Sequence, residues 1–155
     1  VLQKLRDCGC ALEIDEQGVT ITPGELTAVD ITTQPFPGFP TDLQAPFMAL
    51  MCTAQGTSVI SEKIYENRLQ HVAELQRMGA SIRIDGSTAI VEGVSSLSAA
   101  PVTGSDLRAA AAMVLAGLVA RGTTKVYGLK HLDRGYDDIE SKLSRVGARV
   151  NRNSV

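Results

Sequence analysis

The sequence predicts an α/β protein built from repeated βαβαββ units, because one pattern of residues recurs at a nearly fixed spacing. In this pattern a helix-like segment ends at a glycine and is followed by alternating residues typical of a β-strand. It occurs three times, with its glycines at Gly9, Gly79 and Gly147, which are 70 and 68 residues apart. Glycine suits these positions because it readily adopts the left-handed conformation that ends many helices.

Two further observations support the repeat. Thr41–Ala45 (TDLQA) resembles Ser105–Ala109 (SDLRA), and both segments begin helix-like stretches. Downstream, two pairs of residues share one offset of 66 residues: Gly56 with Gly122, and Arg68 with Arg134.

The complete unit is expected to span residues 25–94. Its elements in chain order are a strand at 27–32, a helix at 41–55 capped by Thr41, a strand at 57–61, a helix ending at Met78, and two strands joined by a turn at 85–87. Pro46 falls in the first turn of its helix, where the missing N–H costs little.

Two partial units are expected on either side. Residues 1–24 form the tail of one unit, with a helix and a strand at 11–14, and residues 95–155 form most of another. The second partial unit is predicted to contain a strand at 101–104, a helix at 105–121 capped by Ser105, a strand at 123–127, a helix ending at Val146 and a strand at 148–151. Because the chain opens within an amphipathic helix pattern, we expect residues 1–155 to be a piece of a longer protein.

The composition is that of a soluble globular protein, with 155 residues, 44% hydrophobic and 21% charged. Fifteen Lys and Arg against 17 Asp and Glu give a net charge of −2, which argues against a nucleic-acid or membrane partner. Cys8, Cys10 and Cys52 are an odd number without a CxxC pair, and His71 and His131 lack ligand spacing. We therefore expect a cytoplasmic protein with reduced, mostly buried thiols and no metal or cofactor.

Four charged residues at equivalent repeat positions suggest a site for an anionic ligand. Asp42 and Asp106 lie at helix starts, and Arg68 and Arg134 follow the second strand of each unit. Helix N-termini carry unpaired N–H groups, and arginine offers forked donors suited to phosphate or carboxylate. Two simpler interpretations stay open: the aspartates cap their helices, and the arginines are solvated or pair with the acidic residues beside them in the sequence.

Residues 35–42 (PFPGFPTD) are the least generic segment of the chain. Three prolines restrict the backbone to an extended approach to the following helix. This rigid segment places Asp42 at the helix start, which suits a positioned general base. A loop shaped by proline with no chemical role is the alternative.

At these residues the chain resembles the enolpyruvyl transferases, and most closely the branch that acts on UDP-N-acetylglucosamine. The resemblance extends from Lys4 to Ala148. It rests on five motifs: Phe39–Asp42 (FPTD), Glu66–Arg68 (ENR), Arg77–Ala80 (RMGA), Asp106–Ala109 (DLRA) and Asp133–Tyr136 (DRGY).

The resemblance implies an inside-out α/β barrel, in which three βαβαββ units surround a pseudo-threefold axis in each of two domains. Residues 1–155 would then be an incomplete single domain, and the other domain would be absent. It implies transfer of the enolpyruvyl group of phosphoenolpyruvate to the 3′-hydroxyl of UDP-N-acetylglucosamine, the first committed step of peptidoglycan synthesis. By motif, Asp42 and Arg134 would be catalytic, with Asp42 facing the sugar hydroxyl as general base or as orienting acceptor. Ile64 would contact the nucleotide sugar through its backbone, and Arg68, Arg108 and Arg134 would line the phosphoenolpyruvate side.

Two family features have no match in this sequence. The family's proton donor, a cysteine or an aspartate, lies on a loop of the other domain, and its phosphoenolpyruvate-binding lysine lies near the N-terminus of the full-length enzyme. None of the three cysteines has a matching context, so the chain alone is expected to be inactive. A fragment of the shikimate-pathway enolpyruvyl transferase and a non-catalytic α/β repeat module remain as alternatives.

Overall fold

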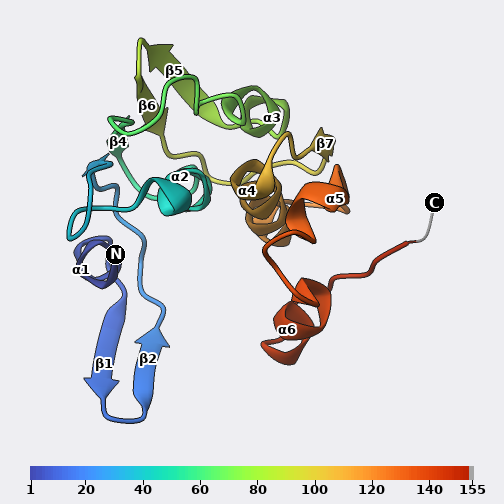
Figure 1. The fold of residues 1–155 in the computed structure, drawn as a ribbon, viewed down its shortest axis with the longest axis horizontal. Coiled ribbons are helices and arrows are strands. Elements are labelled where there is room, and N and C mark those ends of the chain that lie inside the picture. Colours follow the sequence, from blue (N-terminus) through green and yellow to red (C-terminus); the bar gives the residue numbers. More distant parts are fainter. Residues whose placement is uncertain (154–155) are drawn as a thin grey trace.

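The computed structural model describes residues 1–153 and consists of three successive groups of helices and strands. Figure 1 shows a hairpin at the lower left, strands of a mixed sheet with a helix at the top, and a helical segment at the right. Helices α2 and α4 lie side by side between these parts. Among the described residues, no helix is long and apolar enough to cross a membrane.

The first group is a short helix followed by a hairpin. It comprises α1 (Leu2–Asp7), β1 (Ala11–Asp15) and β2 (Gly18–Thr22). The two strands are antiparallel, with Ala11 opposite Thr22. Gly9 ends the helical segment with a φ of 104°, in the left-handed region that the glycine pattern predicts. The helix and first strand of the predicted tail are therefore confirmed.

The second group confirms the βαβαββ order. It comprises β3 (Ile31–Thr32), a 3₁₀ turn η1 (Thr41–Leu43), α2 (Gln44–Met51), β4 (Thr57–Ser61), α3 (Val72–Arg77), β5 (Ser81–Asp85) and β6 (Thr88–Glu92). The four strands form one sheet in the order β3-β4-β6-β5. Strands β3 and β4 are parallel, and β6 runs antiparallel to both of its neighbours.

The third group repeats the first half of this order. It comprises β7 (Pro101–Thr103), α4 (Leu107–Val119), β8 (Lys125–Tyr127), α5 (Leu129–Leu132) and α6 (Ile139–Arg145). Strands β7 and β8 are parallel, as β3 and β4 are in the second group. The repeat expected from the sequence is therefore present in the backbone.

Two predicted elements of the second group are shorter than expected. The strand at 27–32 is reduced to β3, because the carboxylate of Asp30 accepts the Val59 N–H at 2.7 Å where a backbone carbonyl would otherwise accept. The helix predicted to reach Gln55 ends at Met51. Its first three residues form a 3₁₀ turn, and Thr41 does not cap it because the Thr41 hydroxyl donates to Glu62 instead.

Two predictions for the third group are also wrong. The N-cap of α4 is Asp106 and not Ser105, since Asp106 Oδ1 accepts the N–H groups of Arg108 at 2.7 Å and Ala109 at 3.1 Å. The strand predicted at 148–151 is absent from the described residues. In the complete unit the equivalent strand, β5, pairs with β6. In the third group no strand follows that could pair with residues 148–151 within residues 1–153.

The core lies between α2 and α4 and beneath the four-stranded sheet. On α4, the small buried side chains of Ala112 and Ala116 belong to the same core as α2, which lets the two helices approach closely. Ala110 and Ala111 pack with Leu132 of α5 instead. Gly104 allows a similarly close contact, because a Cβ at this position would lie 2.4 Å from the Cβ of Ala110. The largest fully buried side chains include Met48, Met51, Leu75 and Met113.

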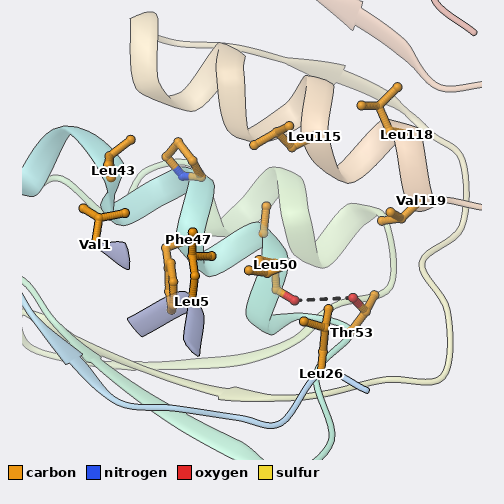
Figure 2. Close-up of a pocket in the computed structure, with 12 residues that line it drawn as sticks. Val1, Leu5, Leu26, Leu43, Phe47, Leu50, Thr53, Leu115, Leu118 and Val119 are labelled. Atoms are coloured by element: carbon orange, nitrogen blue, oxygen red, sulfur yellow. Dashed lines mark hydrogen bonds between the residues drawn. The ribbon is translucent and has the colours of Figure 1, made fainter. Parts of the chain in front are cut away.

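An apolar groove of about 350 Å³ runs between α1, α2 and α4 (Figure 2). Its walls are aliphatic and aromatic, and the Thr53 hydroxyl that it contains donates to the Leu50 carbonyl at 3.3 Å. It is lined by Val1, Leu5, Leu26, Leu43, Pro46, Phe47, Ala49, Leu50, Thr53, Leu115, Leu118 and Val119. No charged side chain lines the groove, so the groove is not the predicted anion site.

Candidate active site

Asp42 lies at the point where the second and third groups of elements meet. Its Oδ1 accepts a hydrogen bond from Arg108 Nε at 2.6 Å and a longer one from Arg68 Nη1 at 3.4 Å. Arg108 comes from the first turn of α4, whereas Arg68 comes from the loop between β4 and α3. The Asp42 side chain remains 65% exposed, so its carboxylate is open to a ligand.

The two arginines stabilise the ionised form of Asp42. The hydrogen bond from Arg108 is the main cause that lowers the pKa of Asp42 below its ordinary value, and partial burial opposes it. The charge of Arg108 and the contact with Arg68 lower this pKa further. Without a ligand, Asp42 is therefore a charged acceptor and only a weak base.

Arg68 is held in place before any ligand binds. Its guanidinium carbon lies 4.2 Å from the centre of the Tyr65 ring, a cation–π contact. Only 15% of its side chain is exposed. Its ion pair is with Asp42 and not with its sequence neighbour Glu66, so the simpler interpretation of Arg68 is wrong.

Arg134 lines a second cavity of about 270 Å³, which is connected to Asp42 through Arg108. The lining residues are Asp106, Leu107, Arg108, His131 and Arg134. Arg108 belongs to both places, because it lines this cavity while its Nε binds Asp42. Hydrogen bonds thus join Arg68 and Arg108 to Asp42, and Arg134 lines the same cavity as Arg108. We call these four residues the charged strip.

Asp133, which precedes Arg134 in the sequence, pairs with Arg152 and not with Arg134. Arg152 binds Asp133 through two hydrogen bonds of 2.7 and 3.1 Å, and its Nε lies 2.6 Å from Glu140 Oε1. The hydrogen bond from Arg152 lowers the pKa of Asp133. Among residues 1–153, Arg134 itself forms no ion pair, which leaves its guanidinium available to the cavity.

The two aspartates at equivalent repeat positions have different roles. Asp106 caps α4, so the simpler interpretation holds for it. Asp42 caps no helix and pairs with two arginines instead. The residue two positions later differs as well: Arg108 is partly exposed, whereas Gln44 is fully buried and its amide has no partner among the described residues.

Glu62 is a residue of the site that sequence reasoning missed. It directly follows β4 and is only 3% exposed. Its carboxylate accepts hydrogen bonds from Thr33 Oγ1 (2.8 Å), Ile64 N (2.8 Å), Tyr65 N (3.1 Å) and Thr41 Oγ1 (3.0 Å). Burial raises the pKa of Glu62, but these hydrogen bonds outweigh it and leave the pKa below its ordinary value. An acidic residue directly after the strand Thr57–Ser61 was the only signal in the sequence.

Ile64 lies on the loop that Glu62 holds. Its N–H donates to Glu62, so only its carbonyl and its side chain, which is 37% exposed, remain for a ligand. A backbone contact to a ligand would therefore have to use the Ile64 carbonyl.

The histidines and cysteines lie mostly outside this strip. His71 is 3% exposed, and its burial lowers its pKa to about 4. Cys8 and Cys52 are buried as expected, whereas Cys10 is only partly buried. Burial raises the pKa of Cys8 and raises that of Cys52 to about 12, so both of these thiols are protonated and shielded. Within residues 1–153, no three His, Cys, Asp or Glu side chains are close enough to hold a metal ion.

Comparison with known proteins places this geometry in a family. The chain is 83% identical over 153 residues to the UDP-N-acetylglucosamine 1-carboxyvinyltransferase of Synechococcus sp. (strain CC9605), which covers 99% of this chain and 35% of that protein. It is 84% identical over 152 residues to the protein of the same name from Parasynechococcus marenigrum (strain WH8102), covering 98% and 35%. The chain thus spans about a third of the length of these curated relatives.

Solved structures show the same fold. The enolpyruvyl transferase NikO from Streptomyces tendae matches with a TM-score of 0.86 and 29% identity, covering 96% of this chain and 35% of that one. An EPSP synthase from Acinetobacter baumannii matches in fold with a TM-score of 0.73 at 21% identity, covering 98% and 36%. The sequence also matches the family described as EPSP synthase (3-phosphoshikimate 1-carboxyvinyltransferase) over residues 1–143. The chain therefore belongs to the EPSP synthase family of enolpyruvyl (carboxyvinyl) transferases.

Proposed function

We propose that this chain is part of an enzyme that transfers the enolpyruvyl group of phosphoenolpyruvate to the 3′-hydroxyl of UDP-N-acetylglucosamine. The observation that carries the proposal is the strip in which Asp42 lies between Arg68 and Arg108, with Arg134 at the adjoining cavity. A carboxylate paired with two arginines, with a third arginine at the adjoining cavity, suits a reaction between a hydroxyl group and a substrate that carries both a phosphate and a carboxylate group. The name shared by the relatives that are more than 80% identical supports the nucleotide sugar as the acceptor.

In this proposal Asp42 faces the sugar hydroxyl, and the three arginines hold phosphoenolpyruvate. The hydroxyl group gives its proton to Asp42 as its oxygen adds to C2 of phosphoenolpyruvate, and C3 gains a proton from the donor of the other domain, which gives a tetrahedral intermediate. Phosphate then leaves as C3 loses a proton and the double bond forms again. The arginines would stabilise the phosphate and carboxylate charges throughout.

The pairing of Asp42 with two arginines gives the anionic substrate a second effect. Phosphate or carboxylate oxygens that bind Arg68 and Arg108 compete with Asp42 for the same donors. Once these donors turn to the substrate, the pKa of Asp42 rises toward its ordinary value, which makes Asp42 a stronger base. The anion would thus prepare the base that acts on the second substrate.

We propose further that residues 1–155 are an incomplete domain, with a tail unit at 1–24, a complete unit at 25–94 and most of another at 95–155. The apolar groove between α1, α2 and α4 supports this, since Leu115 and Val119 on its wall are 40% and 56% exposed. A helix equivalent to α2 and α4, from the rest of the first unit, would cover it. The proton donor and the lysine would come from the other domain, so this chain alone should release no phosphate.

The setting of the reaction follows from the same proposal. An enzyme acting on UDP-N-acetylglucosamine in this way works on a nucleotide-bound precursor in the cytoplasm. Its product would enter peptidoglycan synthesis, and through it cell-wall growth, cell shape and division.

A chimeric enzyme tests the acceptor. In the Synechococcus relative, the segment matched by this chain is replaced with residues 1–155, and binding is followed by isothermal titration. We expect UDP-N-acetylglucosamine to bind, shikimate 3-phosphate not to bind, and Asp42→Asn to weaken binding while Asp85→Asn, on the edge strand β5, does not. Binding of shikimate 3-phosphate alone would instead support the shikimate-pathway alternative.

A further inference from the structure

The buried carboxylate of Glu62 serves two different segments of the candidate site. Its Oε1 accepts from Ile64 N, Tyr65 N and Thr33 Oγ1, so it holds the loop after β4. Its Oε2 accepts from Thr41 Oγ1 at 3.0 Å, so it holds the start of η1. One side chain therefore joins two segments that are distant in the sequence.

Each of these segments carries a residue of the charged strip. Thr41 directly precedes Asp42, and the loop held by Oε1 runs on to Tyr65, on which Arg68 stacks. The Arg68–Asp42 hydrogen bond of 3.4 Å spans the same two segments at the surface. Glu62 thus lies beneath a contact that depends on the relative placement of its two partners.

Thr33 fixes the orientation of this network. Its hydroxyl donates to Glu62 Oε1 at 2.8 Å and accepts the Lys63 N–H at 2.8 Å, so its single proton has one direction. With Oε1 accepting three hydrogen bonds and Oε2 one, only an ionised carboxylate satisfies all four donors at once.

We infer that Glu62 is a positioning residue: through its two carboxylate oxygens it fixes the position of Asp42 relative to the Ile64–Arg68 loop. The inference rests on the proposed function in assigning these two segments to one site. Glu62 touches neither substrate in this account and acts only through Thr41 and the loop.

Two substitutions separate the halves of the network. Thr41→Val removes the hydroxyl that reaches Oε2 and leaves the three bonds to Oε1 in place, whereas Thr41→Ser keeps the hydroxyl. Glu62→Gln keeps the shape and lets one oxygen serve the loop, but its neutral acceptor binds the Ile64 and Tyr65 N–H groups more weakly. Glu62→Ala removes all four hydrogen bonds of the carboxylate and, where this variant folds, shows the effect of losing the whole network.

The test measures the Asp42 carboxyl pKa by ¹³C NMR and the exchange rates of the Ile64 and Tyr65 amides in the 155-residue chain. We expect Thr41→Val to raise the Asp42 pKa toward its ordinary value, Thr41→Ser to leave it unchanged, and neither to alter the two amides. Glu62→Gln should speed exchange of both amides roughly tenfold. An Asp42 pKa that is the same in Thr41→Val as in the original chain would overturn the inference, because a purely structural Thr41 changes stability alone.

Titration of the chimera with UDP-N-acetylglucosamine adds the functional measurement. We expect Thr41→Val and Glu62→Gln each to weaken binding several-fold and Thr41→Ser to restore it. Unchanged binding in both variants would overturn the positioning role. If the original chimera does not bind the sugar nucleotide, the proposed function fails, and the NMR measurements still decide the inference.

Discussion

The ion pair between Asp42 and Arg108 yields a prediction whose size follows from its geometry. The two groups lie 2.6 Å apart, but their side chains are 65% and 32% exposed, so solvent screens their attraction. Exposed pairs of this kind contribute about 0.2 to 1 kcal/mol, and the short distance favours the upper end. A double-mutant cycle with Asp42→Asn and Arg108→Gln should therefore give a coupling of about 1 kcal/mol in the free energy of unfolding at pH 7.

The pH dependence of this coupling provides its control. Because the pKa of Asp42 is lowered in the folded chain, the pair stabilises the fold above the unfolded pKa, and this contribution is lost as pH falls through the folded pKa. Urea unfolding of the four proteins at pH 7 and in strong acid measures both values. A matched change, Arg83→Gln on β5, should show no coupling to Asp42. No coupling at pH 7, or the same coupling in strong acid, would refute the pairing on which the site depends.

Three further predictions concern the fold around the site. Gly104→Ala should lower the free energy of unfolding by about 1 to 3 kcal/mol, because the new Cβ would lie 2.4 Å from that of Ala110; a cost near zero in urea unfolding would contradict the packing. Asp106→Ala should cost about 1 kcal/mol in the same assay through loss of the α4 cap, whereas Ser105→Ala should cost almost nothing, and equal effects would count against the cap. Burial lowers the pKa of His71 to about 4, so between pH 6.5 and pH 4 the unfolded chain binds more protons than the folded chain, and the free energy of unfolding decreases as the pH is lowered. His71→Gln should remove up to about 3 kcal/mol of this loss, and an unchanged pH profile of the free energy of unfolding would refute the prediction.

Local patterns in the sequence were sufficient to predict the repeat. The three glycines that end helices, and the matching helix starts at 41–45 and 105–109, depend on short-range chemistry that each unit repeats. The elements that failed depend on partners elsewhere. The predicted strand at 148–151 has no neighbouring strand among residues 1–153, and the first strand of the complete unit is interrupted where Asp30 binds Val59.

The site could be predicted only in part, for the same reason. Asp42, Arg68 and Arg134 were singled out by their repeat positions and Arg108 by its motif. In the structure Arg68 and Arg108 bind Asp42, and Arg134 lines the same cavity as Arg108. The contact between Arg108 and Asp42 joins residues 66 apart, and no local pattern indicates it. Glu62 was missed because its partners lie up to 29 residues away, and a buried carboxylate with four donors is defined by tertiary structure alone.

Equivalent positions of the two units have different roles where their local structure differs. Asp42 and Asp106 occupy the same place in their units, yet only Asp106 caps a helix. The first turn of α4 is regular and offers its N–H groups to a cap, whereas α2 begins with a 3₁₀ turn held by Thr41 and Glu62. That local difference leaves the Asp42 carboxylate available to Arg68 and Arg108.

The rate of phosphate release by the chimeric enzyme tests the central claim most directly. With residues 1–155 in place of the matching segment of the Synechococcus relative, we predict phosphate release from phosphoenolpyruvate that requires UDP-N-acetylglucosamine. Asp42→Asn should lower kcat by about 10²-fold or more, as expected for loss of a general base, while Asp85→Asn leaves it unchanged. A chimera that is inactive, or one in which Asp42→Asn and Asp85→Asn behave alike, would contradict the account.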